Sequence, residues 1–227
     1  MTTPTAAMIF AAGFGTRMGG LTKTTPKPLI RVAKRSLLQR TLDLSFDAMI
    51  TTNVVNSHYL GDQIVAHLND QDVIVSPEDH ILETGGGLKH ALRHLQDGPV
   101  FTMNSDAIWT GANPFKVLQA NWQSEMGALL LLKHVSDTQG RMPPGDFSLS
   151  ADGRISRGGD YVFLGAQIIQ TTPITDHNET AFSLNVIWDQ MIANRTAFGC
   201  IFSGEWCDVG RPENIKTAEE MLAIADV

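Results

Sequence analysis

The stretch Ala6-Ala7-Met8-Ile9-Phe10-Ala11-Ala12, followed by Gly13-Phe14-Gly15-Thr16-Arg17-Met18-Gly19-Gly20, decides the class of fold. An unbroken apolar run of this length is typical of a strand that is buried on both faces of a parallel sheet, and the glycines after it predict a turn. Because helices cover both faces of such a sheet, the stretch predicts an α/β fold.

The rest of the chain repeats this alternation of strands and helices. Apolar or β-rich runs, which predict strands, lie at residues 49–55, 73–75, 100–103, 127–132, 161–169 and 198–202. Apolar residues at three- and four-residue spacing predict helices at 36–46, 60–68, 87–95, 115–122 and 183–192. We therefore expect a mostly parallel sheet with helices on both faces, and ligands bound beyond the carboxyl ends of its strands.

Residues 133–157 depart from the alternation. The segment contains Pro143 and Pro144 together with several glycines and serines among short β-like pieces. We interpret it as a lid or hairpin inserted into one domain that spans residues 1–227, because no linker divides the chain and no internal repeat is present.

Composition limits the function further. The chain has 227 residues, 43% of them hydrophobic, which suffices for a full core, and a formal net charge of -7 that argues against nucleic acid as the main partner. It has two cysteines, no basic and apolar leader and no apolar run of about 20 residues, so we expect a cytoplasmic protein without a membrane partner. We expect a monomer or a small homo-oligomer.

The glycine-rich loop is a candidate phosphate site, since glycines let backbone N–H groups approach an anion. Arg17 adds a planar guanidinium and Lys27 a compact cation, and Pro26 and Pro28 predict an extended stretch that holds Lys27 in place. A turn without a ligand explains two glycines equally well. Met18 stands where a dinucleotide-binding fingerprint needs its third glycine, and no Walker A lysine is present.

Two aspartates follow predicted strands. Asp106 comes after the run at 100–103, and Asp208 comes after the run at 198–202. Both could share one Mg²⁺ that bridges two phosphate groups, because aspartate oxygens suit this cation. The ordinary alternatives are an aspartate that caps the next turn at Asp106 and a turn residue before Gly210 at Asp208.

Five motifs follow one another along the chain: Ala11-Ala12-Gly13-Phe14-Gly15-Thr16-Arg17-Met18, Thr25-Pro26-Lys27-Pro28-Leu29, Glu83-Thr84-Gly85-Gly86-Gly87, Asn104-Ser105-Asp106 and Trp206-Cys207-Asp208-Val209-Gly210. Together, and in this order, they resemble the motifs of the sugar nucleotidyltransferase family. The resemblance implies a Rossmann-like, GT-A-like single domain and a Mg²⁺-dependent enzyme. It also implies that a nucleoside monophosphate passes from an NTP to a sugar-1-phosphate, with release of pyrophosphate and without a covalent enzyme intermediate.

The resemblance also implies roles for individual residues. Nucleotide binding is implied for Ala11, Ala12, Gly13, Gly15, Thr16, Arg17, Glu83, Gly86 and Asn104, with the segment from Glu83 to Gly86 facing the base. Arg17, Lys27 and Asp106 would act in catalysis, and Asp106 and Asp208 would hold Mg²⁺. The sugar phosphate would meet Lys27, Asp146, Gly165 and residues 182–185. A turn at Asp146, a packing glycine at Gly165 and a helix cap at Ser183 are the ordinary alternatives.

Within the family, the short chain and residues 82–87 look most like members that use UTP and N-acetylmuramate-1-phosphate in cell-wall recycling. The alternatives are mannose, glucose or heptose phosphate or phosphocholine with GTP, dTTP or CTP, and a nucleotide-sugar-binding paralogue without catalysis. Gly20, Ser105 and Phe14 depart from the family pattern. Because the chain ends soon after Asp208, we expect no C-terminal regulatory domain.

Two other sets of residues are interpreted as structural. His90 and His94 lie four residues apart beside Lys89 and Arg93, which favours a solvated helix face over a metal site. Cys207 has no activating neighbour, since the adjacent Asp208 would raise the pKa of its thiol.

Overall fold

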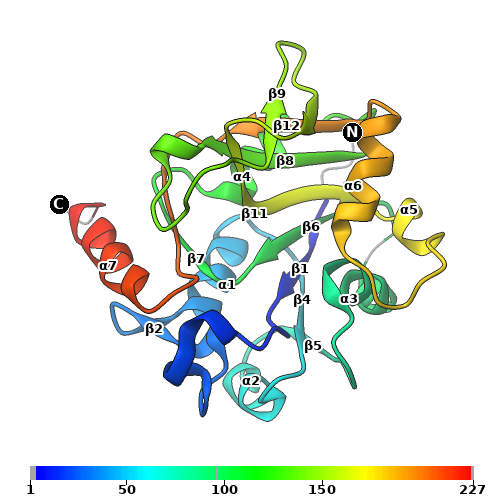
Figure 1. Ribbon diagram of the computed structural model, residues 1–227. Helices are drawn as coiled ribbons and strands as arrows, with labels where there is room; N and C mark the ends of the chain where they lie inside the picture. The colour runs from blue at the N-terminus through cyan, green and yellow to red at the C-terminus, as the bar shows by residue number, and fades with distance from the viewer. Residues whose placement is uncertain (1–3, 96, 226–227) are drawn as a thin grey trace.

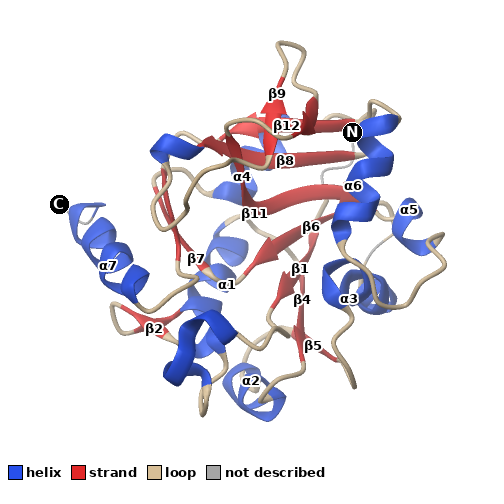
Figure 2. Cartoon of the chain, viewed as in Figure 1, coloured by secondary structure: helices blue, strands red, loops and turns tan. Residues whose placement is uncertain are grey.

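The computed structural model describes residues 4–95 and 97–225, which form a single domain around a nine-stranded mixed sheet. Figures 1 and 2 show this sheet with helices on both of its faces. Its strands are β1 (Ala6–Phe10), β4 (Thr52–Ser57), β5 (Ile74–Pro77), β6 (Pro99–Asn104), β8 (Ala128–His134), β9 (Phe147–Leu149), β10 (Ile155–Arg157), β11 (Tyr161–Gln170) and β12 (Ala197–Ile201). Four further strands pair outside the sheet: β2 (Arg31–Val32), β3 (Arg35–Ser36), β7 (Ala107–Thr110) and β13 (Glu205–Asp208).

The sheet has two parts that differ in strand direction. In the first part, the order β6-β1-β4-β5 is entirely parallel, as predicted. β11 then runs antiparallel to both β6 and β8, and β12 is parallel to β8. The parallel part therefore gathers the carboxyl ends of β1, β4 and β6 at one edge, where we expected ligands to bind.

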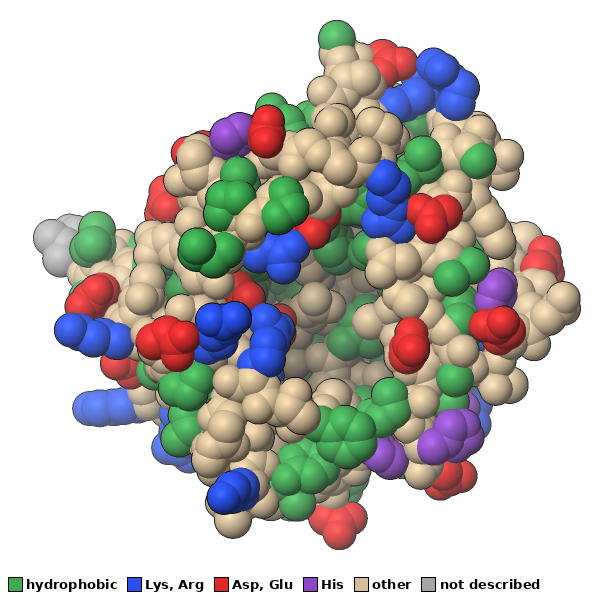
Figure 3. Space-filling view, viewed as in Figure 1, with side chains coloured by type: hydrophobic (Ala, Val, Ile, Leu, Met, Phe, Trp, Pro, Cys, Tyr) green, Lys and Arg blue, Asp and Glu red, His purple; other side chains and the backbone are tan. Residues whose placement is uncertain are grey.

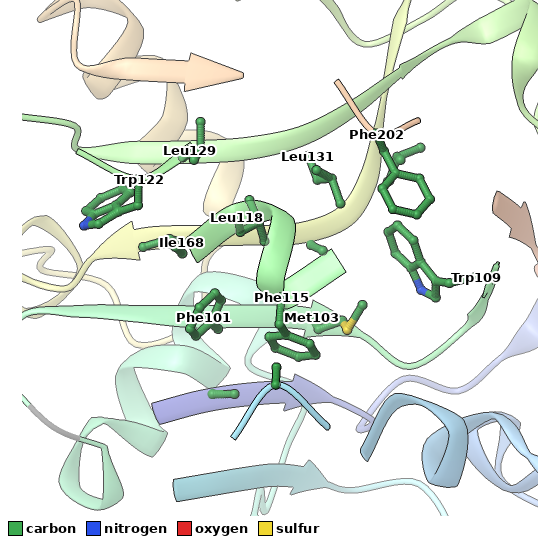
Figure 4. Close-up of a cluster of buried hydrophobic side chains, with 14 of the residues drawn as sticks. Phe101, Met103, Trp109, Phe115, Leu118, Trp122, Leu129, Leu131, Ile168 and Phe202 are labelled. Carbon is green, nitrogen blue, oxygen red and sulfur yellow. The ribbon is translucent and has the colours of Figure 1, made fainter. Parts of the chain in front are cut away.

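Helices cover both faces of the sheet and bury its apolar residues. They are α1 (Leu37–Asp47), α2 (Gly61–Leu68), α3 (Glu83–Ala91), α4 (Pro114–Asn121), α5 (Thr172–Thr175), α6 (Leu184–Ala193) and α7 (Glu213–Ala225). On one face, Phe115 and Leu118 of α4 pack against Phe101 of β6 (Figure 4). On the other face, Leu88 of α3 and apolar residues of α6 belong to the same buried cluster as Met8 of β1.

The predicted first strand is shorter than its apolar run. Ala6, Ala7, Met8 and Ile9 are fully buried, as the sequence predicts. The strand ends at Phe10, because the backbone N–H of Ala11 donates to a side chain instead of a neighbouring strand. The chain thus turns away from the sheet at the start of the glycine loop.

Several predicted boundaries were wrong. β4 begins at Thr52 rather than at 49, since Met49 has φ +59° and ends the turn after α1. α3 begins at Glu83 rather than at 87, so its glycines lie inside the helix. Lys27 starts a short 3-10 turn, Lys27–Leu29, where we expected extended backbone. Another 3-10 segment, Thr16–Thr22, continues the glycine loop.

The segment 133–157 contains the hairpin of β9 and β10, which projects from the sheet next to β12 in Figure 1. β9 joins the sheet where Phe147 pairs with Tyr161 at the start of β11. Its role as a lid stays a prediction. Among the described residues, no helix has both the length and the apolar character that are needed to cross a membrane.

Candidate active site

A cleft of about 330 Å³ opens beyond the carboxyl ends of β1, β4 and β6. Its walls come from the glycine loop, from Lys27, from the ends of β4 and β5, from the start of α3 and from residues 104–106. Figure 3 shows this region as a hollow with positively and negatively charged side chains on its rim. Segments that are distant in sequence therefore meet where the parallel sheet predicts a ligand.

The glycine loop is shaped around Lys27. Gly15 has φ +63°, and a Cβ at this position would lie 2.8 Å from the Cβ of Lys27. The carbonyl oxygen of Gly15 accepts hydrogen bonds from the backbone N–H of Met18 and from the hydroxyl of Thr22. Glycine is thus required at position 15 by both its backbone conformation and the close approach of Lys27.

Lys27 reaches across the cleft to Asp106. Its Nζ lies 2.7 Å from Oδ2 of Asp106, and 11% of its side chain is exposed. Beneath it, the loop packs through Met18 onto an apolar cluster that includes Ile108 of β7 and Val209 after β13. The packing of the loop therefore positions the lysine, although its backbone is not extended.

The structure brings Asp106 and Asp208 together through a pair of strands that the sequence did not indicate. β7 follows Asp106 directly and pairs antiparallel with β13, which places Asp208 opposite Ala107. The backbone N–H of Val209 also donates to the carbonyl oxygen of Asp106, at 2.9 Å. Nη1 of Arg17 lies 3.9 Å from Oδ2 of Asp208, so both carboxylates have a basic partner in the cleft.

The environment of Asp208 disfavours its charge. Burial is the largest cause that raises the pKa of its carboxyl, and the negative charge of Asp106 raises the pKa further. Lys27, Arg17 and Arg141 act in the opposite direction without reversing the shift. A cation bound between these two partly buried carboxylates would therefore stabilise their negative charges.

The two carboxylates fit a Mg²⁺ ion that takes its remaining oxygen ligands from phosphates. Among the residues that the structure describes, no group of three or more histidine, cysteine, aspartate or glutamate side chains could hold a metal. Mg²⁺ needs only one or two carboxylates when the phosphates of a substrate supply further oxygens. Asp106 and Asp208 supply these two carboxylates.

A smaller hollow of about 120 Å³ adjoins the cleft, and the two share Arg17, Asn104 and Asp106. Gly165 of β11 lines it with φ +85°, and a Cβ there would lie 3.0 Å from the side chain of Asn104. The pairing of β11 with β8 shifts its register between Phe163 and Gln167. Gly165 therefore both lines the hollow and lets a bulged strand approach Asn104.

Asp146 does not line either hollow. Its Oδ2 accepts the backbone N–H of Phe163 at 3.0 Å, and its Oδ1 lies 2.6 Å from Nη2 of Arg141. Arg141, which the sequence analysis missed, does line the smaller hollow. Segment 133–157 thus contributes Arg141 to this hollow, and Asp146 holds the guanidinium of Arg141.

A buried polar network links the glycine loop to α3. Oδ1 of Asn56 accepts the backbone N–H of Ala11 at 2.7 Å, and Nδ2 of Asn56 donates to Oε1 of Glu78 at 2.6 Å. Oε2 of Glu78 accepts the backbone N–H of Leu82 at 3.2 Å. Asn56 and Glu78 line the cleft and were missed, since only the position of Asn56 near a strand end could have indicated them. The N–H of Ala11 is engaged by Asn56.

The glycines of α3 serve mainly to bring another segment close. Glu83, with φ +59°, and Thr84 line the cleft. Gly86 does not line the cleft: its N–H donates to the carbonyl oxygen of Phe182, and a Cβ on it would lie 2.2 Å from the carbonyl oxygen of Thr180. Ser183 caps α6, its ordinary explanation, by accepting the N–H of the second helical residue.

The residues interpreted as structural remain so. Arg93 bonds to the rings of both His90 and His94, which lie on the outside of α3 and the turn after it. Burial raises the pKa of Cys207 to about 11, and the charge of Asp208 contributes to the rise, as expected.

Comparisons with known proteins identify the family of the chain. The family model for the MobA-like NTP transferase domain matches residues 7–169. The chain is 38% identical over 239 residues to the N-acetylmuramate alpha-1-phosphate uridylyltransferase of Caulobacter vibrioides, covering 98% of each chain. It is 32% identical to the enzyme of that name from Neisseria meningitidis, over 95% of this chain and 97% of the relative. The crystal structure of HddC from Yersinia pseudotuberculosis complexed with GMP-PN superposes with a TM-score of 0.78 at 20% identity, over 96% and 99% of the two chains.

These matches confirm the family resemblance and the Rossmann-like fold. The chain belongs to the MobA-like NTP transferase family and, within it, to the sugar-1-phosphate nucleotidyltransferases.

Proposed function

We propose that this chain transfers UMP from UTP to N-acetylmuramate-1-phosphate, with release of pyrophosphate, in the recycling of cell-wall sugars. The observation that carries the proposal is the convergence of the glycine loop, the Lys27–Asp106 pair and the Arg17–Asp208 pair at the cleft and the smaller hollow that adjoins it. Two relatives that match almost the whole chain carry the name of this activity, which supports UTP and the muramate phosphate as the substrates.

The chemistry is one in-line displacement at phosphorus. A phosphate oxygen of the sugar-1-phosphate attacks the α-phosphorus of UTP and forms the new P–O bond. The bond from the α-phosphorus to the oxygen shared with the β-phosphorus breaks, and pyrophosphate leaves with that electron pair. Because the attacking oxygen is already anionic, the reaction needs no general base, and catalysis consists of positioning and charge neutralisation.

The basic side chains have distinct roles in this proposal. Lys27, which is held by Asp106 and largely buried, neutralises the charge of the reacting phosphates. Arg17 binds the departing pyrophosphate from the more open side of the cleft, where 58% of its side chain is exposed. N–H groups of the glycine loop bind the remaining phosphate oxygens.

Mg²⁺ would be held by Asp106 and Asp208. When bound, the ion neutralises negative charge on the phosphates and aligns them. Glu83 and Thr84 would face the base at the far end of the cleft, and Asn104 would separate the nucleotide from the acceptor. We place the reaction in the cytoplasm, since Cys200 and Cys207 are free thiols that a reducing compartment preserves.

The test is pyrophosphate release with Mg²⁺, with each of four NTPs offered against N-acetylmuramate-1-phosphate, mannose-, glucose- and heptose-1-phosphate and phosphocholine. We expect release with UTP and the muramate phosphate. Release with another pair would keep the reaction class and refute the proposed substrates. Binding of UTP without release in any pair would indicate a binding paralogue and refute catalysis.

The carboxylates are tested by Asp106→Asn, which should abolish turnover with an unchanged circular dichroism spectrum. Asp189→Asn is the matched control, because Asp189 of α6 pairs with Arg157 of β10, outside both hollows. Normal turnover in the Asp106 variant would contradict the role in Mg²⁺ binding.

A further inference from the structure

We propose that Arg141 binds the phosphate group of the acceptor sugar-1-phosphate and that Asp146 is the positioning residue that holds Arg141 for this task. The inference rests on the proposed function and assigns a residue to its acceptor side.

The first step concerns the two hollows. The larger one contains the glycine loop and the start of α3, so it suits a nucleotide. The smaller one is bounded by β11, Trp206 and Asp208, and it joins the larger one at Arg17, Asn104 and Asp106. A nucleotide in the larger hollow leaves the smaller one as the side from which an acceptor reaches the α-phosphorus next to Asp106.

The second step concerns charge. The smaller hollow is lined by two carboxylates, Asp106 and Asp208, and by apolar residues of β11, so a phosphate dianion there needs cations. Its lining includes two arginines, Arg17 and Arg141. Arg17 lies against Asp208 and also lines the nucleotide side, where the proposed mechanism uses it. Arg141 lines only the smaller hollow and does not line the cleft.

The third step concerns how Arg141 is held. Asp146 is itself anchored at β11: its N–H donates to the carbonyl oxygen of Tyr161 at 2.7 Å, and its Oδ2 accepts the N–H of Phe163. Oδ1 of Asp146 accepts a hydrogen bond from Nη2 of Arg141, and the guanidinium makes no other hydrogen bond among the described residues. A guanidinium has five N–H donors, so several stay available for the oxygens of a phosphate.

The other arginines of segment 133–157 are used differently. Arg154 pairs with Asp152 and lies over the ring of Phe198. Arg157 pairs with Asp189 and lies over the ring of Phe147. Neither lines the cleft or the smaller hollow. Arg154 therefore offers a matched control: an arginine of the same segment, also paired with an aspartate, outside the site.

The experiment compares kinetic constants for both substrates, with UTP and N-acetylmuramate-1-phosphate as the probes. Arg141→Ala should raise KM for the sugar phosphate about tenfold to a hundredfold, the range for one lost charge-assisted contact, with KM for UTP nearly unchanged. Arg141→Lys should fall between Ala and wild type, because it keeps the charge and loses the planar fork. Guanidinium chloride at millimolar concentration should restore part of the activity of the Ala variant. Arg154→Ala should match the wild type.

The positioning role has its own readout. Asp146→Asn keeps an oxygen that can accept the N–H of Phe163 and removes the charge that holds Arg141, so KM for the sugar phosphate should rise severalfold. Once Arg141 is alanine, the same change should have little further effect. Full additivity of the two changes would refute the coupling.

Titration calorimetry with N-acetylmuramate-1-phosphate measures the same effect without turnover. Weaker binding to Arg141→Ala than to wild type supports the proposal, and equal binding refutes the role of Arg141 alone. If the wild type neither binds nor converts this compound, the proposed substrate is wrong, and the role of Arg141 for it falls too. Thermal melting of each variant identifies loss of fold, and a folded Arg141→Lys with wild-type constants would also overturn the role.

Discussion

Replacing Gly15 by alanine tests whether the glycine loop is built to hold Lys27. The structure predicts two separate penalties at this position. Gly15 has φ +63°, a left-handed conformation that costs a residue with a Cβ about 1–2 kcal/mol. The new Cβ would also lie 2.8 Å from the Cβ of Lys27, next to the backbone, where a side chain cannot swing away. Overpacking of this kind costs about 1–3 kcal/mol.

The loop supplies its own controls for each penalty. Gly19 has φ +58° and ψ -125°, a different conformation that also disfavours a Cβ, and no atom lies within 4 Å of a Cβ there, so Gly19→Ala carries a backbone penalty of about 1–3 kcal/mol without the contact. Gly20 likewise has open space and no positive φ, so Gly20→Ala carries neither penalty. A change of 1 kcal/mol shifts the Tm of a chain of this size by about 2–4 °C. We expect no loss for Gly20→Ala, a loss of about 2–12 °C for Gly19→Ala, and about 4–20 °C for Gly15→Ala.

The assays are thermal melting and steady-state pyrophosphate release. Since misplacement of a catalytic group by about 1 Å can cost about a hundredfold in rate, kcat should fall by that order in Gly15→Ala. Gly19→Ala and Gly20→Ala should keep kcat near the wild-type value. Equal kcat in the Gly15 and Gly19 variants would refute the reasoning, because the contact with Lys27 would then have no consequence for catalysis.

Two further predictions concern buried polar groups. Asp208→Asn should abolish turnover yet raise Tm at pH 7, because folding raises the pKa of this carboxyl and its negative charge therefore destabilises the folded protein. The gain in Tm should shrink as the pH falls towards 3.8, the ordinary pKa of an aspartate. A variant less stable than wild type at pH 7 would contradict this sign. Asn56→Ala should lower the free energy of unfolding by about 2–3 kcal/mol in a urea titration, since the N–H of Ala11 and Oε1 of Glu78 then lose their hydrogen bonds to Asn56. Asn69→Ala, at an exposed position after α2, should change it little.

The parallel part of the fold could be predicted because its signals are local. The apolar run at β1 is short, continuous and followed by glycines, and each of these properties reflects a strand that is buried on both faces. Asp106 could be proposed as a cleft residue for the same reason, since the end of a buried strand in such a sheet is a defined place. The encounter of Asp106 with Asp208 depends on β7 and β13, which are four residues each. A four-residue strand carries too little periodicity to be recognised.

The remaining site residues depend on the path of the chain in space. Arg141 lies in a stretch without regular pattern, where an arginine is indistinguishable in sequence from a solvated one. Its role follows only from the pairing of Asp146 with β11. Glu78 is similar, because Asn56, its partner, is 22 residues away on another strand. Gly86 shows the opposite case: glycines that resemble a ligand motif are required by the approach of residues 180–182.

The antiparallel pair of β7 and β13 has a consequence for the order in which the active site is assembled during synthesis. Most of the residues that line the cleft, from the glycine loop to Asp106, leave the ribosome in the first half of the chain. The second carboxylate, Asp208, and the residues of α7 that pack beneath the loop with Met18, such as Ala218, are made last. The order of synthesis therefore places most residues of the cleft before the second carboxylate of the proposed metal site. Any chain that terminates before β13 would lack the second carboxylate.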